Sequence, residues 1–454
     1  MQYRLAMKAA IIGVIVIGLQ VALSMILGQI RERAWLQTSV EQDIANAAAS
    51  AQVLTGPVVL VEWREKITET DRDKDGLALP PKTRYVHHKQ LLAPRTTLWQ
   101  GNAAVEARKR GIYHANLFRS QWTLQGTISL QPYLSGTPLG EVVDAQAYVV
   151  LGISDQRGIT NSPALRISNR EIAFQAGNKG AFDSAAIYAD LGPIDLSQTH
   201  HLAFEMNLDV MGTSSIAIAP TAAQTDVAMQ SNWPHPSFQG RFLPTTHAIS
   251  DGGYNAQWQV SHLARNFDKA LDAGMTDNQE RLQVSFVEPA NTYQQSERAI
   301  KYGLLFIVLT FSALFVLEAS QRAAIHPIQY GLVGLALAIF FLLLVSLSEH
   351  LPFAIAYLIA ATACVLLLTA YTSAVLHSTR KGFAAGAGIT ALYGIVYGIL
   401  LSEDNALLMG SLLLFIALAA VMLGTRHMDW YGLIQSPAKR SAPPAPSQHE
   451  VQGG

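Results

Sequence analysis

The chain has a single cysteine among its 454 residues, and this scarcity limits how its water-exposed part is held together. Cys364 lies within an apolar run from Ala354 to Tyr371, whereas the polar stretch between residues 28 and 300 has no cysteine. That stretch therefore forms no disulfide and relies on packing alone, even in an oxidising compartment. Sites built from several thiolates are excluded for the same reason.

Basic residues are also scarce in the second part of the chain. The net charge is -1, and only seven Lys and Arg residues follow from Lys301 onward. A neutral chain without a basic stripe lacks the charge that phosphate backbones require, so we expect no nucleic-acid partner.

Motifs for the common hydrolytic chemistries are missing. The sequence has no Walker motif, no Gly-x-Ser-x-Gly elbow and no His-Glu-x-x-His helix. These absences argue against ATP-driven, hydrolase and metalloprotease functions. We therefore expect a protein that is not an enzyme and that needs neither a cofactor nor a metal.

Long hydrophobic runs dominate the two ends of the sequence. Ala9–Leu27 is long enough to cross a bilayer and, because no small-x-small cleavage site follows, is better explained as an uncleaved anchor than as a signal peptide. Five further runs crowd together after residue 300. The resulting division is a cytoplasmic N-terminus (1–8), a first span (9–27), a helical stalk (28–55), a β-rich domain (56–300), a five-helix bundle (301–425, with spans 302–317, 329–345, 352–371, 382–401 and 406–424) and a cytoplasmic, disordered tail (426–454).

The charges of the short loops predict the orientation. Loops with Arg322 and with Arg380 and Lys381 are cationic, and the intervening loops around Glu349 and Glu403 are acidic or mixed. Positive loops stay in the cytoplasm. Six spans then place both termini inside and the large domain outside. We expect a multi-pass membrane protein in contact with membrane lipids. In a bacterium with an outer membrane, it lies in the inner membrane and its large domain is periplasmic.

The domain between the spans shows a period of two. Trp122, Leu124, Ile128 and Leu130 alternate with polar neighbours, and the same pattern recurs at 202–210, 254–260 and 282–286. Such alternation is typical of strands with one buried face, so we predict antiparallel sheets forming a sandwich or a barrel-like structure.

Two features in the domain resemble metal sites. Residues 71–76 copy the start of an EF-hand loop, but Lys82 occupies the twelfth position where a bidentate Glu belongs. Two His-His pairs, His87–His88 and His200–His201, point to opposite faces if they lie on strands. We therefore expect a solvated loop and no metal site.

Several segments together resemble a known family. They include 231–238 (SNWPHPSF), 296–306 (SERAIKYGLLF), 326–330 (HPIQY), 346–350 (SLSEH) and 428–431 (MDWY). In this order they resemble the CreD family of inner-membrane proteins. The resemblance implies a role in cell-envelope integrity and in the response to envelope stress and β-lactams. It implies no catalytic mechanism.

Polar residues beside the spans are the candidate coupling or ligand groups. Glu318, at the inner end of the second span, is either part of a proton or substrate relay with His326 or an interfacial carboxylate paired with Arg322. Glu349 and His350, at the outer end of the third span, either bind a ligand or form a polar boundary. Trp233 and His235 lie in a proline-flanked loop that suits ligand capture or an ordinary turn.

The leading hypothesis from the sequence is a non-enzymatic envelope factor whose periplasmic domain binds a cell-wall or envelope partner. The alternative is a transporter or flippase of a lipid, peptide or small amphiphile that uses the residues near the spans. A third hypothesis is a membrane enzyme with its pocket edge at residues 233–238.

Overall fold

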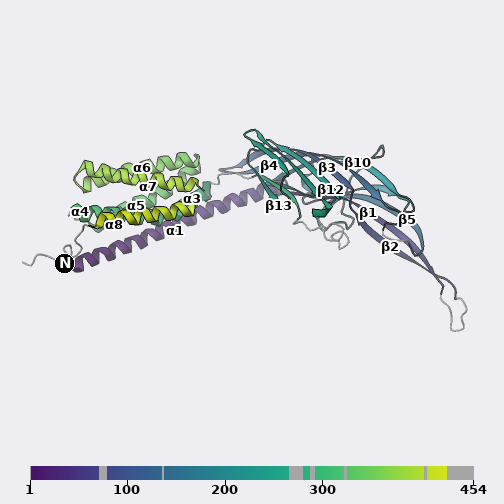
Figure 1. Cartoon of the computed structure of the whole chain (residues 1–454), viewed down its shortest axis with the longest axis horizontal. Coiled ribbons are helices and arrows are strands. Elements are labelled where there is room, and N and C mark those ends of the chain that lie inside the picture. The colour runs from purple at the N-terminus through teal and green to yellow at the C-terminus, as the bar shows by residue number, and fades with distance from the viewer. Residues whose placement is uncertain are drawn as a thin grey trace, which may run out of the picture. The chain divides into compact units, whose positions relative to one another are not determined.

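The chain divides into two compact units, Met1–Trp35 with Ala290–Gly454 and Leu36–Pro289, which we call the membrane unit and the β domain. The computed structural model describes residues 2–70, 79–134, 138–264, 280–286, 292–321, 325–402 and 406–426 (Figure 1). The EF-hand-like segment 71–76, Arg322, the acidic pair Glu403 and Asp404 with the adjacent Asn405, and the tail from 427 lie outside the described residues.

Two mixed sheets build the β domain. The first sheet has the order β13-β16-β11-β1-β5-β9-β8, with β2 also paired to β1. Its strands are β1 (Gln52–Glu69), β2 (Lys82–Leu92), β5 (Glu141–Ile153), β8 (Gln175–Ala176), β9 (Ala186–Pro193), β11 (Ser215–Ala219), β13 (Pro236–Gly240) and β16 (Leu282–Phe286).

The second sheet has the order β14-β15-β12-β3-β4-β10-β6-β7. Its strands are β3 (Thr96–Arg110), β4 (Tyr113–Leu130), β6 (Ala164–Ile167), β7 (Arg170–Ala173), β10 (His200–Thr213), β12 (Gln224–Ser231), β14 (Thr246–Ser250) and β15 (Gly253–Ser261). Two short 3-10 helices, Gln156–Gly158 and His262–Ala264, complete the domain.

The prediction of purely antiparallel sheets was wrong in two places. β1 runs parallel to β11 through Gln52–Thr55, and β3 runs parallel to β12 from Thr96 to Ala103. Alternation predicts which face of a strand is buried but carries no information about the direction of the neighbouring strand. The two parallel pairs place segments distant in sequence side by side in the centre of each sheet.

The stalk also ends earlier than its sequence suggests. Helix α1 covers Gln2–Ala47, and β1 has already begun at Gln52, so Gly56–Pro57 lies within β1 as a cis peptide instead of ending the helix. Gly56 has φ +121°, a conformation that glycine adopts readily. The strand register shifts between Thr55 and Val58, which accommodates the proline inside the sheet.

One continuous apolar core lies between the two sheets. It includes the fully buried indoles of Trp99, Trp122 and Trp258 from the second sheet, which pack with residues such as Val149 and Leu151 from the first. The alternating residues on β4, β10, β15 and β16 supply much of this core, as their period of two predicts. A core of this size compensates for the absence of disulfides.

The middle of β1 is buried on both faces. Val59 and Val61 face the main core, while Val58 and Leu60 join a second cluster with Tyr148 and Phe182. All four β1 residues have no exposed surface. This explains the uninterrupted apolar run at 58–61, because a strand covered on both sides shows no alternation.

The membrane unit is helical. Beside α1 it contains α3 (Thr292–Lys301), α4 (Gly303–Gln321), α5 (Pro327–Ser348), α6 (Phe353–Val375), α7 (Thr379–Leu401) and α8 (Ala406–Thr425). Among the described residues, α1, α5, α6 and α7 are long and apolar enough to span a membrane. The pair α3–α4, bent by 40° at Tyr302, meets the same criterion only when its two helices are taken together, as a broken span or a re-entrant loop, and α8 adds a shorter apolar stretch.

Aromatic side chains fill the centre of the helical bundle. The Tyr393 ring lies 4.9 Å from that of Phe306 and 4.7 Å from that of Phe340. The Tyr357 hydroxyl donates to the Tyr393 carbonyl at 2.8 Å, and the Tyr393 hydroxyl donates to Cys364 Sγ at 3.2 Å. The bundle is therefore packed through its middle, and the hydroxyl groups of Tyr357 and Tyr393 are satisfied within it.

Candidate functional site

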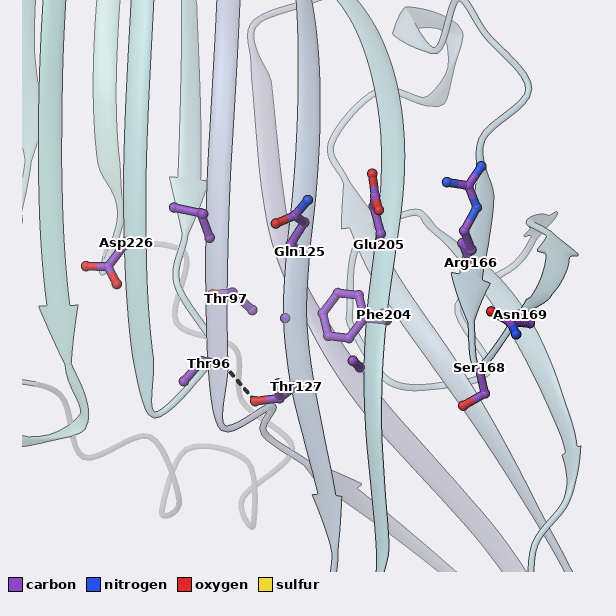
Figure 2. A pocket seen from close by; sticks show the side chains of 13 residues that line it. Thr96, Thr97, Gln125, Thr127, Arg166, Ser168, Asn169, Phe204, Glu205 and Asp226 are labelled. Atoms are coloured by element: carbon purple, nitrogen blue, oxygen red, sulfur yellow. Dashed lines mark hydrogen bonds between the residues drawn. The ribbon is translucent and has the colours of Figure 1, made fainter.

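A groove of about 540 Å³ lies on the second sheet of the β domain. Its lining comes from β3, β4, β6, β10 and β12 and from the turn after β6 (Figure 2). One row of paired residues crosses it, running from Asp226 through Leu98, Gln125 and Glu205 to Arg166. Because these residues occupy the solvent-facing positions of neighbouring strands, their side chains share one surface.

Tight packing beneath the sheet fixes the backbone of the groove. Gly126 lies opposite Phe204, and a Cβ at Gly126 would come within 2.6 Å of the Phe204 ring. Glycine therefore lets the buried ring lie across β4. At the end of the groove, Ser168 and Asn169 both have positive φ, 45° and 65°, which gives the tight β6–β7 hairpin its turn.

The polar groups of the groove are only partly paired with one another. The Thr96 and Thr127 hydroxyls are hydrogen-bonded at 2.7 Å, as the dashed line in Figure 2 marks. Gln224 donates to Asp226 Oδ2 at 3.0 Å, while Asp226 Oδ1 is buried and finds no hydrogen-bond partner in the described part of the chain. Arg166 and Glu205 are cross-strand neighbours, yet no ion pair joins them among the described residues. The groove thus offers free donors and acceptors.

The loop with Trp233 and His235 is a self-contained turn. The Trp233 indole Nε1 donates to the His235 carbonyl at 3.0 Å, and the two rings meet edge to face at 6.5 Å. Trp233 packs on the domain core, and Asn232 fixes the loop to β3 by accepting from the Val105 amide at 2.8 Å. The imidazole of His235 is exposed.

Glu318 is held by partners that sequence reasoning missed. Its Oε1 atom forms an ion pair with Lys8 of α1, and its Oε2 atom accepts from the Tyr330 hydroxyl at 2.9 Å. Lys8 also donates to the Ile325 carbonyl at 2.7 Å and lies 5.6 Å from the Tyr330 ring centroid. The carboxylate is thereby neutralised and hydrogen-bonded where α1, α4 and α5 meet.

His326 does not join Glu318. Its Nδ1 atom accepts from the Ile328 amide at 3.3 Å, and its own amide donates to Gln329 Oε1 at 3.0 Å. Together with Pro327 at the first helical position, these bonds form a capping box at the start of α5. The described contacts of His326 are those of a helix cap.

Glu349 and His350 differ in their surroundings. Glu349 ends α5 and forms an ion pair with Arg33 of α1 at 3.5 Å. Its side chain is 15% exposed. The His350 side chain is exposed, and its amide donates to the Leu347 carbonyl at 3.1 Å. The two neighbours therefore do not converge on one site.

The histidine pairs have partners in the β domain. His88 Nε2 lies 2.9 Å from Glu65 Oε2, and the His88 ring stacks on Trp63 at 4.9 Å. His200 Nε2 contacts the Asp195 carbonyl at 2.7 Å. Within the described residues, no group of three or more His, Cys, Asp or Glu side chains could hold a metal ion.

Part of the groove carried a recognisable signal in the sequence. Gln125 and Thr127 belong to the polar half of the β4 alternation, which identifies them as solvent-facing. Arg166, Glu205 and Asp226 come from three other strands, and their convergence depends on a strand order that local pattern does not specify.

Comparison with known proteins places the chain in a family. The family model for inner membrane protein CreD matches residues 4–431. Inner membrane protein CreD of Escherichia coli (strain K12) is 32% identical over 403 residues, which cover 88% of each chain.

Among solved structures, two of an M1 zinc metallopeptidase from Deinococcus radiodurans align at 9% and 8% identity. The TM-scores are 0.19 and 0.20. Each alignment covers 46% of this chain and 52% of the metallopeptidase chain, so this chain spans about half the length of the metallopeptidase. Such scores carry no argument about fold or function. On the agreement over nearly its whole length with the family model and with the curated relative, the chain belongs to the CreD family of inner membrane proteins.

Proposed function

We propose that this chain supports cell-envelope integrity and the response to envelope stress and β-lactams. In this proposal the β domain lies in the periplasm and binds a wall or envelope partner, while the helices anchor it without catalysing a reaction. The observation that carries the proposal is the open groove with unpaired polar groups on a domain whose interior is closed by packing. Such a domain is built to present a surface.

The proposed orientation has six spans, with both termini in the cytoplasm and the β domain outside. The ion pair between Lys8 and Glu318 supports it, because the start of α1 and the end of α4 then lie at the same membrane face. Further along α1, Arg31 pairs with Glu297 on α3 and Arg33 pairs with Glu349 at the end of α5. This is the arrangement expected when α1 and α5 run outward and α4 runs inward.

A complementation experiment tests the proposal. A deletion strain is challenged with a β-lactam and with detergent, and is rescued by the full chain or by residues 1–300. Rescue by residues 1–300 at normal expression would assign the function to the anchored domain. If the full chain gives no protection in any of these challenges, the proposed function is wrong.

A transport function remains the second candidate, and one observation favours it. The hydroxyls of Ser296 and Thr310 are buried in the membrane unit, on the two helices that bend at Tyr302, and have no hydrogen-bond partner among the residues that the structure describes. Against it, the cavity between Leu314, Val333 and Leu376 has a volume of only about 10 Å³, close to that of a single water probe. The test is uptake of a lipid, peptide or small amphiphile into vesicles that contain the protein. Uptake that is lost in the Thr310→Val variant and kept in the Thr390→Val variant would support transport.

A further inference from the structure

Carboxamide side chains surround the groove on the solvent-facing side of the second sheet. They are Gln100, Gln125, Asn207, Gln224, Gln257 and Gln259, on β3, β4, β10, β12 and β15, and all are exposed. We call this set the amide face. In the strand register, Gln257, Gln100 and Asn207 share one row across β15, β12, β3, β4 and β10, with Ala228 and Thr123 between them. Amides therefore recur on every second strand, about 9.6 Å apart.

Much of the hydrogen-bonding capacity of the amide face is unused within the protein. No described residue is hydrogen-bonded to the side chain of Gln100, Gln125 or Gln259. A carboxamide provides two donor hydrogens and an acceptor oxygen. The surface therefore presents donors and acceptors in alternation, with the buried and unpartnered Asp226 Oδ1 at the edge of the groove.

The composition of this surface indicates which ligands fit it. Protein interfaces concentrate binding energy in aromatic and apolar anchors. In the groove the exposed large apolar side chain is Leu98, which is 37% exposed. Polyanions are disfavoured by Glu205 and Asp226, which both line the groove. A polymer of low charge density that is rich in hydroxyl and amide groups meets neither obstacle.

We propose that the groove and the amide face bind an extended, N-acetylated glycan chain. This inference rests on the proposed function and names the class of envelope partner. Sugar hydroxyls and acetamido groups donate and accept as the carboxamides do, and a spacing of two strands, about 9.6 Å, is comparable to the length of one disaccharide unit. The groove volume of about 540 Å³ lies within the usual range for small-ligand sites of about 300–1,000 Å³.

Charged groups in the groove add selectivity. Arg166 has no carboxylate partner among the described residues and can receive a lactyl carboxylate of a wall glycan in a two-pronged contact. Glu205, next to Arg166, and Asp226, at the other end of the row, can accept hydrogen bonds from sugar hydroxyls. A glycan with an occasional carboxylate therefore fits better than one with none.

Binding to the purified full chain in detergent micelles tests this inference. The probes are glycan strands freed of peptide by an amidase, stem peptides, outer-membrane polysaccharide and dextran. We expect the freed strands to bind and dextran to bind at least ten-fold more weakly. The variant Gln125→Ala with Arg166→Ala removes two contacts, each worth about two- to ten-fold in affinity, and should reduce strand binding by about four- to hundred-fold. Gln239→Ala, on the first sheet, is the matched control and should bind as the unaltered chain does.

Several outcomes would overturn the inference. Equal strand binding by the double variant and the control would exclude this groove, as would capture of stem peptides in place of strands. Binding of outer-membrane polysaccharide alone, lost in the double variant, would support the glycan class but assign it to that source. If no glycan binds while the full chain still protects the deletion strain, this inference fails and the proposed function stands. An equal thermal unfolding midpoint for the double variant and the unaltered chain would show that the loss of binding is not caused by misfolding.

Discussion

Lys8 and Glu318 are 310 positions apart in the sequence and form an ion pair between the start of α1 and the end of α4. The second carboxylate oxygen accepts from Tyr330, and the ammonium group also donates to the Ile325 carbonyl. Both charges are mostly shielded, with 21% and 16% of their side chains exposed. A pair with these partners fixes α1 to the bundle, because separating it would leave an uncompensated charge.

Glu318→Gln should therefore lower the stability of the membrane unit. We expect a loss of about 1–3 kcal/mol, since removing one partner leaves Lys8 partly buried and unpaired. The double variant Lys8→Met with Glu318→Leu should cost less than the sum of the single changes. Thermal unfolding in detergent micelles would measure both effects.

Glu349→Gln is the control for this prediction. Arg33 is 44% exposed, so the Arg33–Glu349 pair is screened by solvent and should contribute less than about 1 kcal/mol. A Glu318→Gln protein that is fully stable yet gives no rescue in the deletion strain would contradict the anchoring role. That result would instead support the hypothesis that Glu318 belongs to a proton or substrate relay.

The sequence predicted which face of a strand is buried better than it predicted which strands are neighbours in a sheet. Alternation correctly marked Trp122 and Leu124 on β4 as buried, because period two reports burial directly. It could not reveal the parallel pairing of β3 with β12, since the two strands are separated by more than a hundred residues. The convergence of Asp226 with Gln125 across β3 depends on that pairing, so the groove was not predictable.

The candidate residues at the membrane boundary show a similar limit. Glu318 stands out in sequence because a carboxylate beside an apolar run is costly. Its partner Lys8 is unremarkable, because a basic residue before a first span is expected on orientation alone. His326 is a candidate by its sequence because it is titratable. The following Pro327 and Gln329, however, are the sequence signature of the helix cap that it forms.

Small residues on α7 allow close packing against α6, and this can be tested with two glycines on one helix. Gly386 is buried, and a Cβ there would overlap the Thr369 side chain. Gly388, half a turn away, has nothing within 4 Å. Gly386→Leu should cost about 1–3 kcal/mol through overpacking, and Gly388→Leu should be nearly neutral. Equal thermal unfolding midpoints for the two variants would show that α6 and α7 do not pack in this way.

In the β domain, Gly101 is the position where the Trp122 ring lies over the backbone of β3. The two residues are paired across the strands, and a Cβ on Gly101 would overlap the indole. Because Trp122 is 2% exposed, its ring has little room to move. Gly101→Ala should destabilise the domain by about 1–3 kcal/mol. The comparison is Gly252→Ala, whose nearest contact would be Ser250 Oγ at 3.9 Å, and denaturant unfolding should separate the two.

Asp155 connects the end of α1 to the rest of the β domain and should make that connection sensitive to acid. Hydrogen bonds from the Arg157 guanidinium, and then from the Ser50 and Arg157 amides, hold the pKa of Asp155 well below its usual range. Arg157 in turn donates to the Asn46 carbonyl at 2.7 Å. A carboxyl whose pKa is depressed by folding stabilises the native state above its unfolded pKa of about 3.9. This contribution is lost as the pH falls from there toward the folded value.

Asp155→Asn should lower the unfolding midpoint at pH 7 and flatten its decline between about pH 5 and pH 2. Asp144 provides the control, because Arg64 also lowers its pKa but its side chain is 53% exposed, so Asp144→Asn should change the midpoint little. The measurement is thermal unfolding of the full chain across this pH range, followed by tryptophan fluorescence. A decline as steep in Asp155→Asn as in the unaltered chain would mean that other carboxyl groups carry the acid sensitivity. The Asp155–Arg157 pair would then be a surface contact rather than the fastening of α1 to the domain.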